Sequence, residues 1–403
     1  MSVFFVILDK KIEYKFIEVI NLNLKKFLST LLLTAIILMM FTTSFSAVNI
    51  KEVNMELDVK SAVLMDANTG TILYSYNSEQ PLAPASVTKI MTLLLIFEAI
   101  NEGKLSYTDK LIVSENASSM GGSQIFLEPG EEMMVDDLLK SVIIASANDA
   151  ALTLAENVGG SEEAFVSMMN NKAEELGMTS THFENVTGLD DDVVNHLTSA
   201  KDIAIMSREL LKYDKVSEYA TIWMDTIRNG EFGLTNTNRL IRFYKGITGL
   251  KTGYTSKAGY CVSASAKRDN LHLIAVIMGA ETSQIRNNAA TKLLDFGFAN
   301  YSVYESKNNT SKTIKVCGGT KDEAYIQYDD YFTLLNKGDE KRIEKEVQLA
   351  EYLVAPVLKN EVVGKVIYKI DGEIVGESNI ICQESVEKIS FFEYLFKILK
   401  NIF

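Results

Sequence analysis

The chain has 403 residues, of which 47% are apolar and 23% are charged. This composition is typical of a globular protein and excludes a disordered, collagen-like or mostly membrane-embedded chain, and the length predicts at least two domains. The net charge is −13 and no basic block occurs, so nucleic acid is not an expected partner. The three cysteines and three histidines are widely separated, which predicts no disulfide framework, no metal site and no cofactor.

The N-terminus carries the pattern of an export signal. Lys25 and Lys26 precede the apolar run Phe27–Phe41, and small residues follow it. This order is typical of a secretory signal peptide, and small residues favour cleavage after Ser46. The apolar run is shorter than the roughly 20 residues that a spanning helix needs, so an uncleaved membrane anchor is the less favoured alternative. We therefore expect residues 1–46 to be removed on export.

The next part of the chain mixes strands and helices. Residues 57–76 predict a β-hairpin, and strand-like runs return at 259–267 and 270–279. Apolar residues at helical spacing lie between and after these strands. The expected helices are 86–102, 136–158, 161–177, 199–213 and 284–298. We expect residues 47–303 to form an α/β (α+β) domain in which helices flank an antiparallel sheet.

The C-terminal part has a different pattern. Short alternating runs separated by Gly- and Asp-containing turns predict a small all-β domain over residues 304–384. Residues 385–403 place aromatic and aliphatic side chains at i, i+3, i+4 and i+7, with Lys397 and Lys400 on the other side. Such a helix lies in the headgroup region of a membrane, and the alternative is a helix that packs on the protein's own core.

Ser86 and Lys89 form the first motif with chemical meaning. They stand three residues apart at the start of an expected helix, after Pro84, so their side chains project from the same face. A lysine amine accepts a serine proton if burial or another cation lowers its pKa. A helix N-terminus also favours developing negative charge near the serine. An isolated Ser-x-x-Lys is weak, because the same pattern occurs at Ser385.

Two further motifs follow in the chain. Ser146 and Asn148 interrupt an apolar helical stretch, where buried polar side chains need hydrogen-bond partners. Lys251, Thr252 and Gly253 precede the strand 259–267 and offer a cation, a hydroxyl and a bare backbone edge to an extended ligand. Ser-x-x-Lys, Ser-x-Asn and Lys-Thr-Gly in this order are the signature of class A β-lactamases and penicillin-binding proteins.

With these motifs, the sequence resembles the low-molecular-mass penicillin-binding proteins, which are serine-type D-alanyl-D-alanine carboxypeptidases of the peptidase S11 type. The likeness runs from about Leu57 to the C-terminus and includes SAVLMDANTGTILYSYN, PASVTKIMT, GGSQIFLEPGE, TNTNRLI and GLKTGYT. The stretch GGSQIFLEPGEEMMVDDLLKSVIIASANDAA is most similar to the sporulation-associated branch. The resemblance implies a β-lactamase/transpeptidase-like fold and action in the cell wall space, at the outer face of the cytoplasmic membrane.

The resemblance also implies partners and site residues. The partners are peptidoglycan stem peptides ending in D-Ala-D-Ala, and β-lactam antibiotics. Ser86 matches the nucleophile that forms an acyl-enzyme, and Lys89 matches the general base. Ser146 matches the serine that relays a proton to the leaving amine, and Asn148 matches the side chain that holds the substrate amide.

The third motif carries the expected carboxylate site. Lys251 and Thr252 match residues that bind the terminal carboxylate of the substrate, and Gly253 belongs to the same motif. The backbone N–H groups of Ser86 and Tyr254 match the oxyanion hole. Many relatives have histidine where Tyr254 stands, but a backbone donor does not depend on the side chain.

Two alternatives remain open at this stage. A class A β-lactamase has similar motif spacings, but it deacylates with a glutamate, and no Glu-x-x-Leu-Asn occurs between Asn148 and Lys251. A non-catalytic sensor or wall-binding protein would have lost a catalytic residue, whereas all matched positions are intact.

Four other residues have simpler interpretations. His196 is expected to be structural, and Cys261 to be a small buried thiol. Arg239 and Arg286 are candidates for positive potential near the cleft, although the sequence does not place them.

Overall fold

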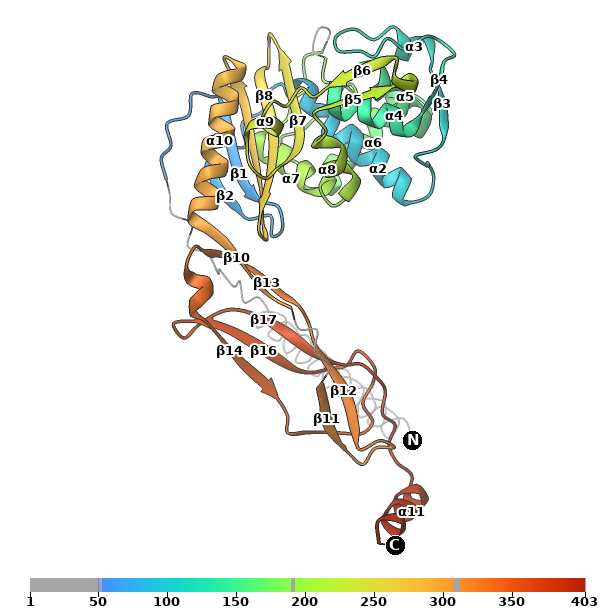
Figure 1. Cartoon of the computed structure of the whole chain (residues 1–403), viewed down its shortest axis with the longest axis vertical. Helices are drawn as coiled ribbons and strands as arrows, with labels where there is room; N and C mark the ends of the chain where they lie inside the picture. Colours follow the sequence, from blue (N-terminus) through green and yellow to red (C-terminus); the bar gives the residue numbers. More distant parts are fainter. Residues whose placement is uncertain (1–49, 51–52, 190–192, 308–311, 403) are drawn as a thin grey trace, which may run out of the picture.

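The computed structural model describes residues 50, 53–189, 193–307 and 312–402. A helix-rich body is followed by an elongated β-rich part, and a separate helix lies at the far end (Figure 1). The predicted signal peptide lies outside the described residues. Among the helices that are described, none is both long enough and apolar enough to cross a membrane.

A five-stranded antiparallel sheet forms the centre of the helix-rich body. The strand order is β2-β1-β9-β8-β7, so β2 and β7 are its two edges. The strands are β1 (Ser61–Asp66), β2 (Ile72–Tyr76), β7 (Ile247–Thr255), β8 (Gly259–Arg268) and β9 (Leu271–Ala280). The predicted hairpin and the two later strands are confirmed, and the fold class is the expected antiparallel sheet flanked by helices.

The two faces of the sheet pack into two separate apolar cores, because side chains alternate along each strand. Along β1, Ala62 and Leu64 belong to the apolar cluster that also contains buried residues of α10 (Ser283–Asn300), whereas Val63 and Met65 belong to the cluster with the other helices. Successive side chains of a strand point to opposite faces, so a strand covered on both faces reads as a continuous apolar run. Helices therefore cover both faces (Figure 1).

The second core is formed largely by helices. They are α2 (Lys89–Asn101), α3 (Glu115–Ser118), α4 (Val135–Lys140), α5 (Asn148–Gly159), α6 (Glu162–Glu175), α7 (Ala200–Leu210) and α8 (Asp214–Ala220). The short helix α9 (Leu240–Phe243) instead contributes Leu240 to the α10 core. The expected helices at 86–102, 161–177, 199–213 and 284–298 are confirmed. The expectation of one helix over 136–158 is wrong, because a π-helical turn, Ser141–Ala145, ends in a left-handed residue at Ser146 and α5 then starts anew.

Two short antiparallel hairpins were not predicted. They pair β3 (Lys110–Ile112) with β4 (Glu132–Met134), and β5 (Met224–Ile227) with β6 (Phe232–Thr235). Each strand has only three or four residues, which is too short for alternation to stand out in the sequence.

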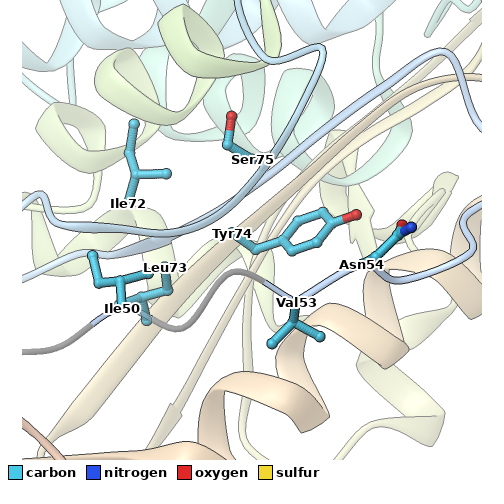
Figure 2. A pocket seen from close by; sticks show the side chains of 7 residues that line it. All are labelled: Ile50, Val53, Asn54, Ile72, Leu73, Tyr74 and Ser75. Atoms are coloured by element: carbon cyan, nitrogen blue, oxygen red, sulfur yellow. The ribbon is translucent and has the colours of Figure 1, made fainter.

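A surface hollow lies at the β2 edge of the sheet. Ile50, Val53 and Asn54 line it together with residues 72–75 of β2 (Figure 2). Because β2 and β7 are opposite edges, this hollow is separated from the Lys-Thr-Gly strand by the width of the sheet, and it contains none of the motif residues.

The β-rich part continues directly from α10. Strand β10 (Tyr301–Ser306) pairs with β13 (Tyr331–Asn336), and a six-stranded sheet has the order β14-β16-β17-β12-β11-β15. Its strands are β11 (Lys312–Cys317), β12 (Glu323–Tyr328), β14 (Ile343–Leu349), β15 (Tyr352–Val354), β16 (Val362–Ile370) and β17 (Glu373–Cys382). At the joint, Lys337 Nζ donates to the Phe298 carbonyl at 2.7 Å, and Leu334 packs into the α10 core.

The chain leaves the β-rich part through a short paired segment. Val386 bridges to Val357, and Ile389 N–H donates to the Gly318 carbonyl at 2.9 Å. Helix α11 (Phe391–Ile402) follows, and the side chains of its described residues 391–396 are exposed. The expected domain boundaries at 46, 303 and 384 stay predictions.

Stacked tyrosines organise the core of the β-rich part. The Tyr331 and Tyr368 rings stack at 3.9 Å, and the Tyr331 hydroxyl donates to the Val375 carbonyl. A Cβ on Gly376 would lie 1.9 Å from that hydroxyl oxygen, so the close approach of β17 to Tyr331 requires glycine.

We predict that Gly376→Ala destabilises the β-rich part without affecting the helix-rich body. The added methyl group displaces Tyr331, and overpacking of this kind costs about 1–3 kcal/mol. Calorimetry is expected to report a lower melting temperature for the β-rich part, with an unchanged transition for the helix-rich body. Gly233→Ala, in strand β6 of the helix-rich body, is the control for a generic glycine effect in a strand, because nothing lies within 4 Å of the added Cβ and its φ is not in the left-handed region. An equal decrease in the melting temperature of both parts would contradict the prediction.

Candidate active site

Ser86 lies on a tight turn at the start of the α2 segment. A 3₁₀ turn, Ala85–Thr88, precedes the α-helix, and Lys89 is the first α-helical residue. Lys89 Nζ lies 2.9 Å from Ser86 Oγ and donates to the Thr187 carbonyl at 3.0 Å. The structure therefore confirms the expected proximity of the two side chains, and Thr187 is a partner that the sequence did not indicate.

Lys89 is enclosed by protein. Its side chain is 0% exposed, and this burial is the largest cause of a pKa held well below the usual range for lysine. The positive charge of Lys251 lowers the pKa further, whereas Asp149 opposes the change. A neutral amine next to a hydroxyl can accept a proton from it.

The helix break sets the backbone at Ser146 and Asn148. Ser146 has φ 65° and is buried, and Asn148 begins α5. Asn148 Nδ2 donates to the Gly121 carbonyl at 2.6 Å, and its backbone N–H donates to the Ser123 carbonyl at 2.7 Å. Among the described residues, its buried Oδ1 has no hydrogen-bond partner. In an uninterrupted helix, the Asn148 N–H would bond to the backbone of the same helix. At the break, the backbone N–H and the side-chain amide of Asn148 bond instead to the loop that carries Gly121 and Ser123.

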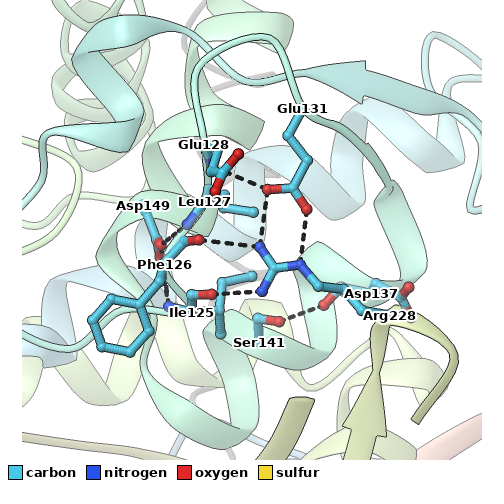
Figure 3. Close-up of polar contacts among 9 residues, drawn as sticks. All are labelled: Ile125, Phe126, Leu127, Glu128, Glu131, Asp137, Ser141, Asp149 and Arg228. Atoms are coloured by element: carbon cyan, nitrogen blue, oxygen red, sulfur yellow. Dashed lines mark hydrogen bonds and ion pairs between the residues drawn. The ribbon is translucent and has the colours of Figure 1, made fainter. Parts of the chain in front are cut away.

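Two charged side chains, Asp149 and Arg228, hold the loop 121–131 in place (Figure 3). The buried Asp149 carboxylate accepts the N–H groups of Ile125 and Leu127, both at 3.1 Å. Arg228 pairs with Glu131 at 2.8 Å and donates to the Ile125 carbonyl at 2.7 Å. Because the loop carries the partners of Asn148, these anchors also fix the Asn148 side chain.

The Lys-Thr-Gly motif lies on the edge strand β7, as expected. A Cβ on Gly253 would lie 2.9 Å from Ser86 N and 3.0 Å from the Pro84 carbonyl oxygen. Gly253 therefore permits direct backbone contact between β7 and the turn that carries Ser86. Tyr254 is exposed, and its ring packs on Tyr260 with centroids 4.2 Å apart.

Lys251 and Thr252 are buried beside this contact. Burial, together with the positive charge of Arg286, lowers the pKa of Lys251 to about 7. Thr252 Oγ1 donates to Thr237 Oγ1 at 2.8 Å, and Thr237 N–H donates to the Ile144 carbonyl at 3.1 Å. Thr237 thus ties the third motif to the turn that precedes Ser146, and only its place in the family-like stretch TNTNRLI pointed to it.

The two arginine candidates differ in position. Arg286 is buried, lies beside Lys251, and has its guanidinium 5.9 Å from the Tyr260 ring. Arg239 is exposed, and its charge helps burial to lower the pKa of Arg286 to about 10. Both therefore contribute positive potential on the Lys251 side of the site. Cys261 is buried, as expected, and sits opposite Gly253 in β8.

The described residues do not meet the requirements of a metal site. In the part of the chain that the structure describes, no group of three or more His, Cys, Asp or Glu side chains is arranged to hold a metal ion.

Family comparisons agree with the geometry. The family model described as D-alanyl-D-alanine carboxypeptidase matches residues 47–282, and that of the penicillin-binding protein 5 C-terminal domain matches residues 298–388. This chain belongs to the D-alanyl-D-alanine carboxypeptidase family. It is 43% identical over 380 residues to D-alanyl-D-alanine carboxypeptidase DacF of Bacillus subtilis, covering 92% of this chain and 97% of that protein.

Other relatives show the same full-length agreement. D-alanyl-D-alanine carboxypeptidase DacC of Escherichia coli is 34% identical over 89% of this chain and 92% of its own length. Among solved structures, penicillin-binding protein 5 from Haemophilus influenzae matches with a TM-score of 0.69 and 31% identity, over 84% of this chain and 100% of that one. Penicillin-binding protein D2 from Listeria monocytogenes in its ampicillin-bound form matches with a TM-score of 0.54 and 32% identity, over 61% of this chain and 100% of that one.

Proposed function

We propose that Ser86 is the nucleophile with which this serine D-alanyl-D-alanine carboxypeptidase removes the terminal D-alanine of peptidoglycan stem peptides. The observation that carries this assignment is the fully buried amine of Lys89, 2.9 Å from the Ser86 hydroxyl, with a pKa lowered by burial and by Lys251. A lysine in this state is a base rather than a solvated cation.

Acylation begins with proton transfer. Ser86 Oγ attacks the carbonyl carbon of the penultimate D-alanine, and its proton passes to the neutral Lys89 amine. The oxyanion forms between the backbone N–H groups of Ser86 and Tyr254, which are brought together by the contact of β7 with the nucleophile turn. The C–N bond then breaks, and the leaving D-alanine amine takes a proton relayed through Ser146. Water hydrolyses the resulting ester and restores Ser86.

Substrate is held on both sides of the reacting bond. The unpartnered Oδ1 of Asn148 accepts an N–H of the peptide backbone, which supplies the hydrogen bond that this buried atom lacks. On the other side, Lys251 and Thr252 bind the terminal carboxylate, with added positive potential from Arg286. β-Lactams carry a comparable carboxylate and acylate the same serine.

The β-lactamase alternative is less well supported. The family match extends through the C-terminal β domain, over residues 298–388, and no Glu-x-x-Leu-Asn lies between Asn148 and Lys251. A long-lived penicillin adduct is expected rather than rapid turnover.

We also propose that the protein is exported and rests on the outer face of the cytoplasmic membrane. The signal-like pattern of residues 1–46 supports export. Exposed aromatic side chains on α11, including Phe391, Phe392 and Phe396, support insertion at the level of the headgroups. A role in sporulation stays a prediction from the similarity of one stretch.

Replacing the nucleophile tests the chemistry. Ser86→Ala is expected to abolish both D-alanine release from diacetyl-L-Lys-D-Ala-D-Ala and covalent labelling by penicillin, because no other group supplies the attacking oxygen. Mass spectrometry of the intact protein measures the adduct. Ser385→Ala is the matched control, since Ser385 stands in the other Ser-x-x-Lys of the chain. Retention of labelling in Ser86→Ala would overturn the assignment.

The rate of acylation by penicillin is expected to follow a bell-shaped pH profile. Acylation requires neutral Lys89, so the rate rises with pH as that amine loses its proton. Carboxylate binding requires charged Lys251, whose pKa is about 7, so the rate falls as pH rises through that value. In Lys251→Arg the guanidinium stays charged, and the alkaline limb should move to higher pH. An alkaline limb unchanged in that variant would contradict the role of Lys251.

Removal of α11 tests membrane association. Because residues 386–389 pair with the β-rich part, the chain is best ended after Ser390. This variant is expected to lose binding to vesicles of anionic phospholipid while its rate of D-alanine release is unchanged. The full-length Phe392→Gln/Phe396→Gln variant keeps the helix but removes apolar area, and it should bind vesicles more weakly. Unchanged sedimentation of both variants with vesicles would refute the proposal.

A further inference from the structure

We propose that His196 and Thr88 position the Ser86 backbone N–H for the oxyanion, through a hydrogen-bond chain that ends on the Ala85 carbonyl. The inference rests on the proposed function, because it assigns a support to an oxyanion donor which that function requires. Neither side chain contacts Ser86 Oγ in this scheme, so both are positioning residues.

Thr88 is the middle residue of this hydrogen-bond chain. It is fully buried in the 3₁₀ turn between Ser86 and Lys89. Its hydroxyl donates to the Ala85 carbonyl oxygen at 2.9 Å and lies 2.8 Å from His196 Nε2. His196 is itself 2% exposed, and it comes from the distant segment that precedes α7. The contact therefore joins two parts of the fold behind the nucleophile.

The other ring nitrogen fixes the direction of these bonds. His196 Nδ1 lies 3.0 Å from the backbone N–H of Glu184, which can only donate. Nδ1 is therefore the acceptor and carries no proton, so the neutral ring carries its proton on Nε2. Nε2–H then donates to Thr88 Oγ1, and the Thr88 proton is left for the Ala85 carbonyl. His196 therefore donates to Thr88, and Thr88 donates to the Ala85 carbonyl, which is the final acceptor.

The end of this chain is the peptide group that contains the Ser86 N–H. The Ala85 carbonyl and the Ser86 N–H belong to one planar unit, so fixing the carbonyl also fixes the direction of the N–H. A hydrogen bond accepted by the carbonyl also polarises the amide and strengthens its N–H as a donor. An oxyanion donor needs both direction and strength.

This peptide group needs outside support. Ala85 has φ +50°, a region that costs energy for a residue with a Cβ. A Cβ on Gly188 would lie 1.9 Å from the Ala85 carbonyl oxygen, so the backbone of Gly188 packs directly against it. The Thr88 hydroxyl and the Gly188 backbone thus hold the carbonyl from two sides.

Conservative pairs of variants separate this role from general stability. Thr88→Val removes the hydroxyl at nearly constant shape, whereas Thr88→Ser keeps it. His196→Asn keeps an acceptor for Glu184 N–H but loses the donor to Thr88. His196→Gln keeps a donor at the Nε2 position but loses that acceptor.

The readouts are the rate of acylation by a fluorescent penicillin, and kcat and KM for diacetyl-L-Lys-D-Ala-D-Ala. Thr88→Val and His196→Asn are expected to lower the acylation rate and kcat by about 10-fold or more, with KM changed by less than about 3-fold, because the lost interaction acts in the transition state. Thr88→Ser and His196→Gln should stay within about 3-fold of the wild-type rate.

Thr92→Val and His182→Asn are the matched controls. Thr92 is also buried and lies four residues further on, in α2, and its hydroxyl donates to the Val186 carbonyl at 2.7 Å rather than to the Ala85–Ser86 peptide. This variant should lower the melting temperature as Thr88→Val does but acylate at the wild-type rate. His182 is exposed, so His182→Asn should change neither quantity.

Two results would overturn the inference. One is wild-type acylation by Thr88→Val; the other is an equal loss of rate in His196→Asn and His196→Gln that follows the melting temperature, which would make His196 purely structural. A wild-type protein that penicillin does not label at Ser86 would instead refute the proposed function, so the two failures are distinguishable.

Discussion

The burial of a lysine amine near a second positive charge is the constraint on which the rest of the cleft depends. Lys89 has no exposed surface, and Lys251 adds a second positive charge to its surroundings. Burying a lysine is unfavourable for the charged form, so the fold must exclude water there while leaving Ser86 accessible to substrate. Strand β7 closes on the turn that carries Ser86, because Gly253 lets the two backbones touch. The positions of Lys89 and Lys251 and the backbone contact at Gly253 therefore depend on one another.

The helix break at Ser146 is a second feature that depends on contacts between distant segments. A continuous helix would direct successive side chains around its axis and would satisfy its own backbone groups. The left-handed turn instead exposes Asn148 to the loop 121–131, and Asp149 accepts two N–H groups of that loop. Asn148 and Asp149, which would be unfavourable in a buried apolar helix without partners, are therefore hydrogen-bonded to this loop and hold it in place. Arg228 holds the outer part of the same loop through Glu131.

The support of the Ala85–Ser86 peptide extends this logic behind the nucleophile. Thr88 and His196 connect it to the segment before α7, so two stretches of chain that are distant in sequence meet at this turn. The β-rich part contributes none of these groups. It continues from α10 and is fixed there by contacts such as Lys337 with the Phe298 carbonyl, which ties the helix-rich body to the β-rich part that carries α11.

The sequence by itself determined the family, the fold class and the residues of the three motifs, because these depend on local spacing and on the alternation of apolar side chains. It also predicted that Lys89 would need burial or a second cation. Only the tertiary structure decided that both are present, since Lys251 and Thr187 reach Lys89 from distant segments. The expected helix over 136–158 was wrong for the same reason: the partners of Asn148 lie in a loop whose position no local pattern encodes.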